Sequence, residues 1–252
     1  MKILSIGDTH GNNVLDRIVP GDFDKIIFLG DYVDSFTVSD EDIINNLYSL
    51  IEFKKTYPDK VELLLGNHDL QYLFNDDTKF RCSGRRESYA FLLHNIFQSN
   101  LKSFKVAYQI QNYLWTHAGI SNGFWDEYEN KSFLYRTMCE TFNLNMFRIE
   151  SLLANTINDL FFNSQRDVEL LSTVGYQRGG HNKFGGIFWA DKNELHCRAI
   201  VDKQNTALTG YNQIVGHNPV NDLDIYQTDE NTSITFIDCQ EYGSKNFLIT
   251  EL

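Results

Sequence analysis

Five short segments of the chain combine aspartate, histidine and asparagine, the side chains that bind divalent metal ions through oxygen and nitrogen. They carry Asp8 with His10, Asp31 with Asp34, Asn67 with His68, and then His117 and His217. Carboxylate, amide and imidazole ligands without thiolate suit manganese, iron or zinc. The six candidate ligands Asp8, His10, Asp31, Asn67, His117 and His217 are too many for one tetrahedral ion. They match two ions that share a carboxylate, an arrangement that activates water and clamps a phosphoryl group.

The elements before the first three segments have the pattern of buried strands. Apolar runs at Lys2–Ile6, Lys25–Leu29 and Val61–Leu65 are each followed by a glycine. The helical spacing of apolar residues in 39–58 predicts a helix between the last two runs. This strand, loop and helix order predicts a largely parallel sheet, and such sheets place ligands beyond the carboxyl ends of their strands. Asp8 and His10 are two residues apart, so an extended backbone points both to one side.

The second half of the chain predicts further strands and a helical insertion. We expect one strand over Tyr108–Trp115 before His117 and a short strand over Gln213–Val215 before His217. Residues 121–173 have helically spaced apolar side chains, and we interpret them as an insertion over the sheet edge within a single domain of residues 1–252. The segments 233–237 and 246–250 alternate like an antiparallel pair.

Composition favours a soluble cytoplasmic protein and argues against nucleic-acid and membrane partners. The 252 residues are 42% hydrophobic and 22% charged, as in globular proteins. No apolar stretch is long enough for a membrane helix, and the chain begins directly with a strand instead of a signal peptide. The net charge of −12 would repel phosphate backbones. The cysteines Cys82, Cys139, Cys197 and Cys239 are scattered, which indicates reduced thiols without a zinc cluster.

With these motifs in this order, the sequence resembles the calcineurin-like metallophosphoesterases, and within them the phosphoprotein phosphatase (PPP) branch. The matching segments are Gly7–Gly11, Gly30–Asp34, Gly66–Asp69, His117–Gly119 and Gly216–His217, joined by the tryptophan-containing Phe188–Asp191. Position 219 is a proline, where many generic members have a second histidine. A last motif with one histidine resembles the phosphatase branch, including bacterial and phage serine/threonine phosphatases, and its diadenosine tetraphosphate hydrolase relatives.

The resemblance implies a fold, a cofactor and a role for each motif residue. The implied fold is α/β, a four-layer αββα sandwich. The implied cofactor is a pair of divalent metal ions, for which manganese is the first candidate and iron or zinc are alternatives. Asp8 and His10 would bind the first ion, Asp31 would bridge both ions, and Asn67, His117 and His217 would bind the second ion. His68 would be the general acid, oriented by Asp34. The nucleophile would be a metal-bridging hydroxide.

The sequence departs from the branch at the residue that usually grips the phosphate. Ser35-Phe36 stands where the branch has Arg-Gly, so the phosphate needs another cationic partner. A guanidinium group can bind a phosphate in a bidentate manner, through two parallel hydrogen bonds. We expect Arg85 or Arg86, from the basic segment 81–86, or Arg178 to bind the substrate, although such a basic segment is also typical of a solvated loop.

Three functions are compatible with these motifs. The first is hydrolysis of a phosphate monoester, including phosphoprotein. The second is hydrolysis of a dinucleoside polyphosphate of the diadenosine tetraphosphate type, or of another nucleotide. The third is a non-catalytic metal-binding scaffold, which would have lost a ligand or the general acid, whereas all of these are present in this chain.

Overall fold

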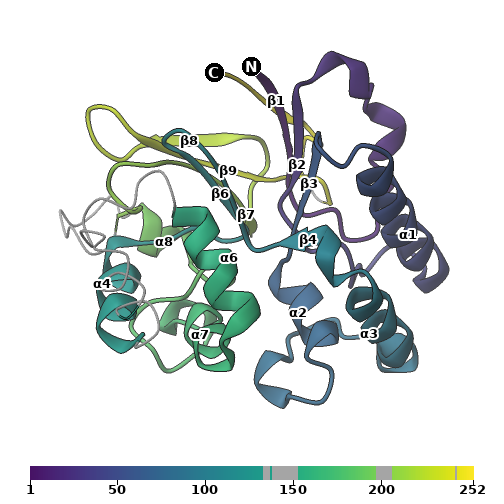
Figure 1. Cartoon of the computed structure of the whole chain (residues 1–252), viewed down its shortest axis with the longest axis horizontal. Coiled ribbons are helices and arrows are strands. Elements are labelled where there is room, and N and C mark those ends of the chain that lie inside the picture. The colour runs from purple at the N-terminus through teal and green to yellow at the C-terminus, as the bar shows by residue number, and fades with distance from the viewer. Residues whose placement is uncertain (133–136, 138–152, 197–205, 242) are drawn as a thin grey trace. The chain divides into compact units, whose positions relative to one another are not determined.

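Two five-stranded sheets form the framework of the protein. The computed structural model describes residues 1–132, 137, 153–196, 206–241 and 243–252. The chain divides into two units, each containing one sheet (Figure 1). The first unit comprises 1–105, 219–223 and 237–252, and the second comprises 106–218 and 224–236. The predicted mixed α/β class is therefore confirmed, while one domain over 1–252 remains a prediction.

The sheet of the first unit is parallel in its central strands, as predicted from the strand, loop and helix order. Its order is β10-β1-β2-β3-β4, in which β1 to β4 run parallel and only β10 is antiparallel. The strands are β1 (Lys2–Ile6), β2 (Lys25–Phe28), β3 (Val61–Leu64), β4 (Phe104–Lys105) and β10 (Leu248–Glu251). Parallel pairing brings the carboxyl ends of β1, β2 and β3, and the polar segments after them, to the same edge of the sheet.

The first unit also contains three α-helices. They are α1 (Asp40–Thr56), α2 (Asn67–Leu73) and α3 (Ala90–Ser99), with short 3-10 turns at Leu15–Arg17, Pro20–Asp22, Thr78–Phe80, Glu87–Tyr89 and Leu101–Ser103. The helix α1 begins where Ser39 accepts a 3.2 Å hydrogen bond from the Asp42 N–H, which satisfies one of the free amide groups of its first turn. Its apolar face, which includes Ile43 and Leu47, is buried, and α1 contacts β3 while α2 contacts α3.

The sheet of the second unit has the order β5-β6-β7-β9-β8. Its strands are β5 (Ala107–Ile110), β6 (Tyr113–Thr116), β7 (Asn212–Pro219), β8 (Asp224–Gln227) and β9 (Ser233–Asp238). The helices of this unit are α4 (Asn122–Lys131), α6 (Leu153–Asn163), α7 (Gln165–Leu171) and α8 (Lys192–Leu195), with a 3-10 turn at Tyr176–Arg178. The helix α6 contacts the edge strand β5 and also α7. The described part of the predicted insertion is thus helical, whereas 133–136 and 138–152 lie outside the described residues.

Two predicted strand assignments were wrong. The segment 108–115 is not one strand but the antiparallel pair β5 and β6, because Gln111 adopts a left-handed φ of 53° and reverses the chain. The last two strands do not pair with each other: β10 pairs with β1, and β9 pairs with β8. Alternation of side chains identifies a half-buried strand, but the partner is chosen by long-range packing that the pattern does not contain.

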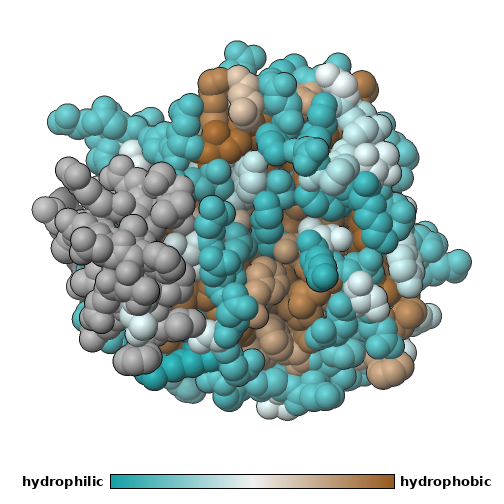
Figure 2. Space-filling model, in the orientation of Figure 1, coloured by the Kyte–Doolittle hydropathy of each residue, from teal (hydrophilic) through white to brown (hydrophobic). Residues whose placement is uncertain are grey.

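The surface of the described residues is mainly polar. In the view of Figure 2 hydrophilic side chains cover much of the described surface, with smaller apolar areas among them. Among the described residues, no helix is both long enough and apolar enough to span a bilayer.

The ends of β2 and β3 are joined by one buried carboxylate, that of Asp69 in α2. Its Oδ2 accepts hydrogen bonds from the N–H groups of Asp31 (2.9 Å) and Gly66 (2.8 Å), and its Oδ1 accepts one from Tyr32 (3.0 Å). Asp69 is completely buried. Hydrogen bonds to a charged acceptor are the strong ones, so this carboxylate holds the two polar segments at a fixed separation.

A second buried carboxyl group belongs to Glu194 of α8, in the other unit. It is 3% exposed, and its Oε2 accepts a 2.6 Å hydrogen bond from the Gly185 N–H. Burial raises the pKa of Glu194 to about 7, although the hydrogen bond from Gly185 opposes the shift. The folded protein therefore binds a proton at this group at pH values where an unfolded glutamate has already lost it.

We predict that Asp69→Asn destabilises the fold by roughly 2–3 kcal/mol, because an amide nitrogen would replace one charged acceptor and face a backbone N–H. Urea unfolding followed by circular dichroism measures this. The matched control is Asp77→Asn: Asp77 accepts from the Lys79 N–H at the start of a 3-10 turn, a role that asparagine performs equally well. Equal urea midpoints for wild type and Asp69→Asn would contradict the assigned role.

Glu194→Gln should change how stability depends on pH. An unfolded glutamate loses its proton near pH 4.5, whereas folded Glu194 loses its proton only near pH 7. Between these values folding takes up a proton, so the stability of wild type falls as pH rises. The melting temperature of wild type should therefore fall more between pH 5 and pH 8 than that of Glu194→Gln, which is neutral throughout. Glu230→Gln, at an exposed position, should follow wild type. Parallel curves for wild type and Glu194→Gln would refute this.

Candidate metal centre

Three predicted ligands from two strand ends lie together in the first unit. Asp8 and His10 follow β1, and Asp31 follows β2. One ligand atom from each lies within 4.8 Å of the other two. Asp8 is 1% and Asp31 2% exposed. Oxygen and nitrogen ligands at this spacing fit a borderline-hard divalent ion, and a cation offsets the cost of burying two carboxylates.

The tautomer of His10 follows from its hydrogen bond. Its Nδ1 lies 2.9 Å from the carbonyl oxygen of Val33. A carbonyl oxygen only accepts, so Nδ1 carries the proton and Nε2 keeps a free lone pair for a metal ion. A ligand histidine held by a backbone carbonyl through its other nitrogen is a common feature of metal sites.

The carboxylate of Asp31 is oriented by the start of α2. Its Oδ1 accepts a 2.9 Å hydrogen bond from the His68 N–H. A Cβ placed on Gly66 would lie 2.1 Å from the same oxygen, so only glycine leaves room for this carboxylate. Gly30 has a φ of +96°, and a Cβ there would lie 2.4 Å from the Gly66 nitrogen. The two glycines therefore allow the strand ends to approach each other.

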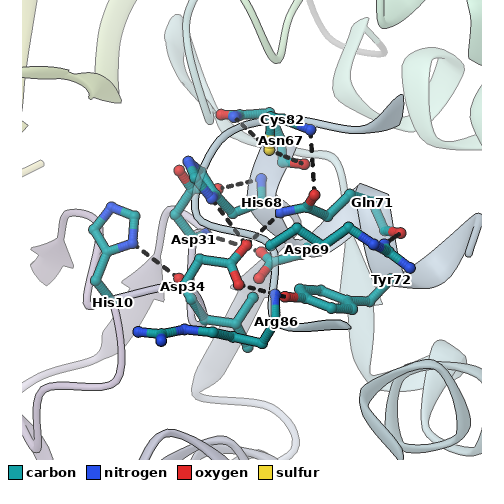
Figure 3. Close-up of polar contacts among 12 residues, drawn as sticks. His10, Asp31, Asp34, Asn67, His68, Asp69, Gln71, Tyr72, Cys82 and Arg86 are labelled. Carbon is teal, nitrogen blue, oxygen red and sulfur yellow. Dashed lines mark hydrogen bonds and ion pairs between the residues drawn. The ribbon is translucent and has the colours of Figure 1, made fainter. Parts of the chain in front are cut away.

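His68 and Asp34 form the predicted pair (Figure 3). The Nδ1 of His68 lies 3.0 Å from the Oδ2 of Asp34. Asp34 is 1% exposed and also accepts hydrogen bonds from the Gln71 amide and the Tyr72 hydroxyl. Burial alone would lower the pKa of His68, but the charge of Asp31 and the hydrogen bond to Asp34 raise it well above its usual value, before the charge of any bound cation is counted. The pair can therefore hold a proton at His68.

Several of the predicted site residues have a left-handed backbone. Among the described residues, six that are not glycine have a positive φ, and four of these are His10 (43°), Asp31 (51°), Asp34 (66°) and His217 (61°). Such conformations are unfavourable for residues with a Cβ and persist where surrounding contacts impose them. Their concentration at residues chosen for their chemistry supports a functional site.

The remaining histidines lie in the second unit. His117 follows β6 and is 0% exposed, and His217 lies in β7 and is 8% exposed. Their ring centroids are 5.1 Å apart. The ring of Trp189 packs edge-on against His217 at 5.5 Å. The parallel pairing of β6 with β7 brings these two histidines together. Asn67, predicted to share their ion, lies in the first unit at the start of α2.

The three candidate substrate arginines all have protein partners. The guanidinium of Arg85 donates to the Gln71 carbonyl (2.6 Å), to Asn75 Oδ1 (2.6 Å) and to Glu87 (3.0 Å). Its side chain is only 7% exposed. These contacts attach the 81–86 segment to α2 and leave few donors for a ligand. Arg85 is therefore the most enclosed of the three arginines.

Arg86 and Arg178 are more accessible. Arg86 donates to the Ser35 carbonyl, so it reaches the position where the branch has its arginine, and its Nε is 3.4 Å from Asp40. In the second unit, Arg178 donates to Asn218, the neighbour of His217 in sequence, and pairs with Asp191 at 2.9 Å. Their side chains are 32% and 26% exposed.

The residues that support His68 were not predicted from the sequence. Gln71 and Tyr72, which bind Asp34, occur three and four residues after His68 on α2. That spacing places them on the same helix face and could have been recognised. Cys82 lies beside Asn67, with its Sγ 3.8 Å from Asn67 Nδ2, and only the fold of the 81–86 segment reveals this.

Comparisons with known proteins agree with the motifs. A sequence model of the calcineurin-like phosphoesterase family matches residues 1–236. A probable serine/threonine-protein phosphatase of Encephalitozoon cuniculi is 29% identical over 133 residues, which are 47% of this chain and 26% of that protein. The matched region thus spans about a quarter of that relative.

Two solved structures were also compared. A Saccharomyces cerevisiae serine/threonine phosphatase described as similar to human phosphatase PP5 has a TM-score of 0.47 at 17% identity, covering 94% of this chain and 67% of that one. A metallophosphoesterase of Sphaerobacter thermophilus has a TM-score of 0.29 at 20% identity, covering 50% and 53%. The family match over residues 1–236 shows that the chain belongs to the calcineurin-like phosphoesterases.

Proposed function

We propose that the protein hydrolyses phosphate monoesters, including phosphoprotein, and that it uses two divalent metal ions. Manganese is the first candidate for these ions. The observation that carries this is the gathering of Asp8, His10 and Asp31 beside the Asp34–His68 pair. A scaffold without catalytic activity would not need a general acid held by a buried carboxylate. We also propose a cytoplasmic location, from the scattered cysteines, and no general binding of nucleic acid, from the net charge of −12.

In this proposal each residue has one task. Asp8 and His10 would hold the first ion, Asn67, His117 and His217 would hold the second, and Asp31 would be a ligand of both. Bound ions would activate a water molecule for attack on phosphorus and neutralise charge on the phosphoryl oxygens. His68, with Nδ1 bound to Asp34, donates the proton on Nε2 to the leaving oxygen. Asp34 keeps the ring oriented and favours its protonated form.

Substrate class is tested by one panel assay with manganese added: p-nitrophenyl phosphate, phosphopeptides and diadenosine tetraphosphate. The first two should be hydrolysed, and preference for the third would instead establish a dinucleotide hydrolase.

Asp31→Asn should abolish turnover and lower metal content, because it removes the carboxylate proposed to bind both ions, and chelation should do so reversibly. Asp16→Asn, an acidic residue of an exposed 3-10 turn, is the matched control. Full activity in excess chelator would refute metal dependence.

A further test concerns the missing arginine of the second motif. We propose that Arg86 binds the phosphate, with Arg178 as the second candidate and Arg85 below both. A charged hydrogen bond made mainly in the transition state contributes about 2–4 kcal/mol, which is about 30- to 1000-fold in rate. Arg86→Ala should therefore lower kcat by this range with metal content unchanged.

The control for this test is Arg81→Ala, because the Arg81 side chain is 48% exposed and pairs with Glu87 at 3.6 Å. It should keep wild-type turnover. If Arg85→Ala, Arg86→Ala and Arg178→Ala all stay within about threefold of wild type, less than 1 kcal/mol, none of these arginines replaces the missing one.

A further inference from the structure

The thiol of Cys82 lies beside the proposed general acid and takes no part in the proposed hydrolysis. One ligand atom from each of Cys82, His68 and Asp34 lies within 4.8 Å of the other two. The Sγ of Cys82 is also 3.9 Å from the Asn67 carbonyl oxygen. Cys82 is half-buried, so a small ion can reach it from solvent.

The three side chains differ in chemistry from the set that holds the manganese ions in the proposal. Asp8, His10 and Asp31 offer oxygen and nitrogen only, which suits harder ions. Cys82, His68 and Asp34 add a thiolate, and the combination of sulfur, imidazole and carboxylate is typical of zinc. Manganese gains little from sulfur, so the two clusters discriminate between the metals.

The cluster is held by contacts that also position the catalytic pair (Figure 3). Gln71 connects two of its members: its amide nitrogen donates to Asp34, and its Oε1 accepts a 3.2 Å hydrogen bond from the Cys82 N–H. Tyr72 donates to Asp34 and accepts a 2.7 Å hydrogen bond from the Arg86 N–H. Both ends of the Cys82–Arg86 segment are therefore fixed to α2, which places the thiol beside His68 before any ion binds.

We propose that Cys82, His68 and Asp34 form a third, inhibitory metal site that is selective for zinc. Binding releases the thiol proton and places zinc on a ring nitrogen of His68. Zinc on Nε2 occupies the nitrogen that would carry the proton for the leaving oxygen. Zinc on Nδ1 replaces the hydrogen bond to Asp34 that orients the ring, so either mode impairs the general acid. The inhibitory part of this proposal rests on the proposed phosphatase function, whereas the metal site itself does not.

X-ray absorption at the zinc edge tests the site directly, without any assay of activity. Manganese-loaded protein with one equivalent of zinc should show a sulfur neighbour at about 2.3 Å. Cys82→Ala should lose this sulfur. Cys239→Ala should keep it, because the buried Cys239 is engaged with the Asn246 carbonyl and belongs to no ligand cluster among the described residues.

Inhibition is then measured on p-nitrophenyl phosphate in excess manganese, each variant being compared with its own zinc-free rate. Wild type and Cys239→Ala should be half-inhibited at a zinc concentration at least about tenfold below that for Cys82→Ala, since loss of one ligand at 1.4 kcal/mol gives this factor. Equal inhibition of Cys82→Ala, or no sulfur neighbour in wild type, overturns the proposal. If no phosphoester is hydrolysed, the phosphatase function fails while the absorption measurement still decides the zinc site.

Discussion

The Asp69 carboxylate, buried at the start of α2, fixes how closely the ends of β2 and β3 approach each other. It accepts backbone hydrogen bonds from Asp31, Tyr32 and Gly66, so both polar segments share one acceptor group. The neighbouring Gly30 and Gly66 have no side chains, which permits this separation. The Asp31 carboxylate then lies over Gly66 and accepts from the His68 N–H. The proposed metal ligand Asp31 and the proposed general acid His68 are thus positioned through a single buried carboxylate.

This arrangement requires unfavourable backbone conformations at several site residues. His10, Asp31 and Asp34 adopt left-handed conformations that glycine would adopt more readily. Each has a side chain that the proposed chemistry needs, so glycine cannot replace it. The surrounding hydrogen bonds, from His10 to the Val33 carbonyl and from Gln71 and Tyr72 to Asp34, supply stabilisation that offsets the strain. A rigid site of this kind loses little free energy in reorganisation when a substrate binds.

The network around Asp34 gives the site two chemical properties. Its hydrogen bonds with His68, Gln71 and Tyr72 fix the orientation of the imidazole, as the proposed proton donation requires. The same glutamine holds the backbone of Cys82, which brings a soft sulfur ligand to an otherwise hard oxygen and nitrogen environment. Selectivity between manganese and zinc would then follow from ligand softness and not from overall affinity. The segment 82–86 is therefore attached to the residues that hold Asp34, although it belongs to none of the motifs.

The sequence by itself determined the α/β class, the strands β1 to β3 and the identity of the motif residues, because strand periodicity, glycine turns and ligand types are local properties. It did not determine that the 108–115 segment folds back at Gln111, that β10 pairs with β1, or that Arg85 is engaged by Gln71 and Asn75. Nor could it place Cys82 beside His68. These features depend on which distant segments compete for the same hydrogen bonds and burial, and that competition is resolved only when the whole chain packs.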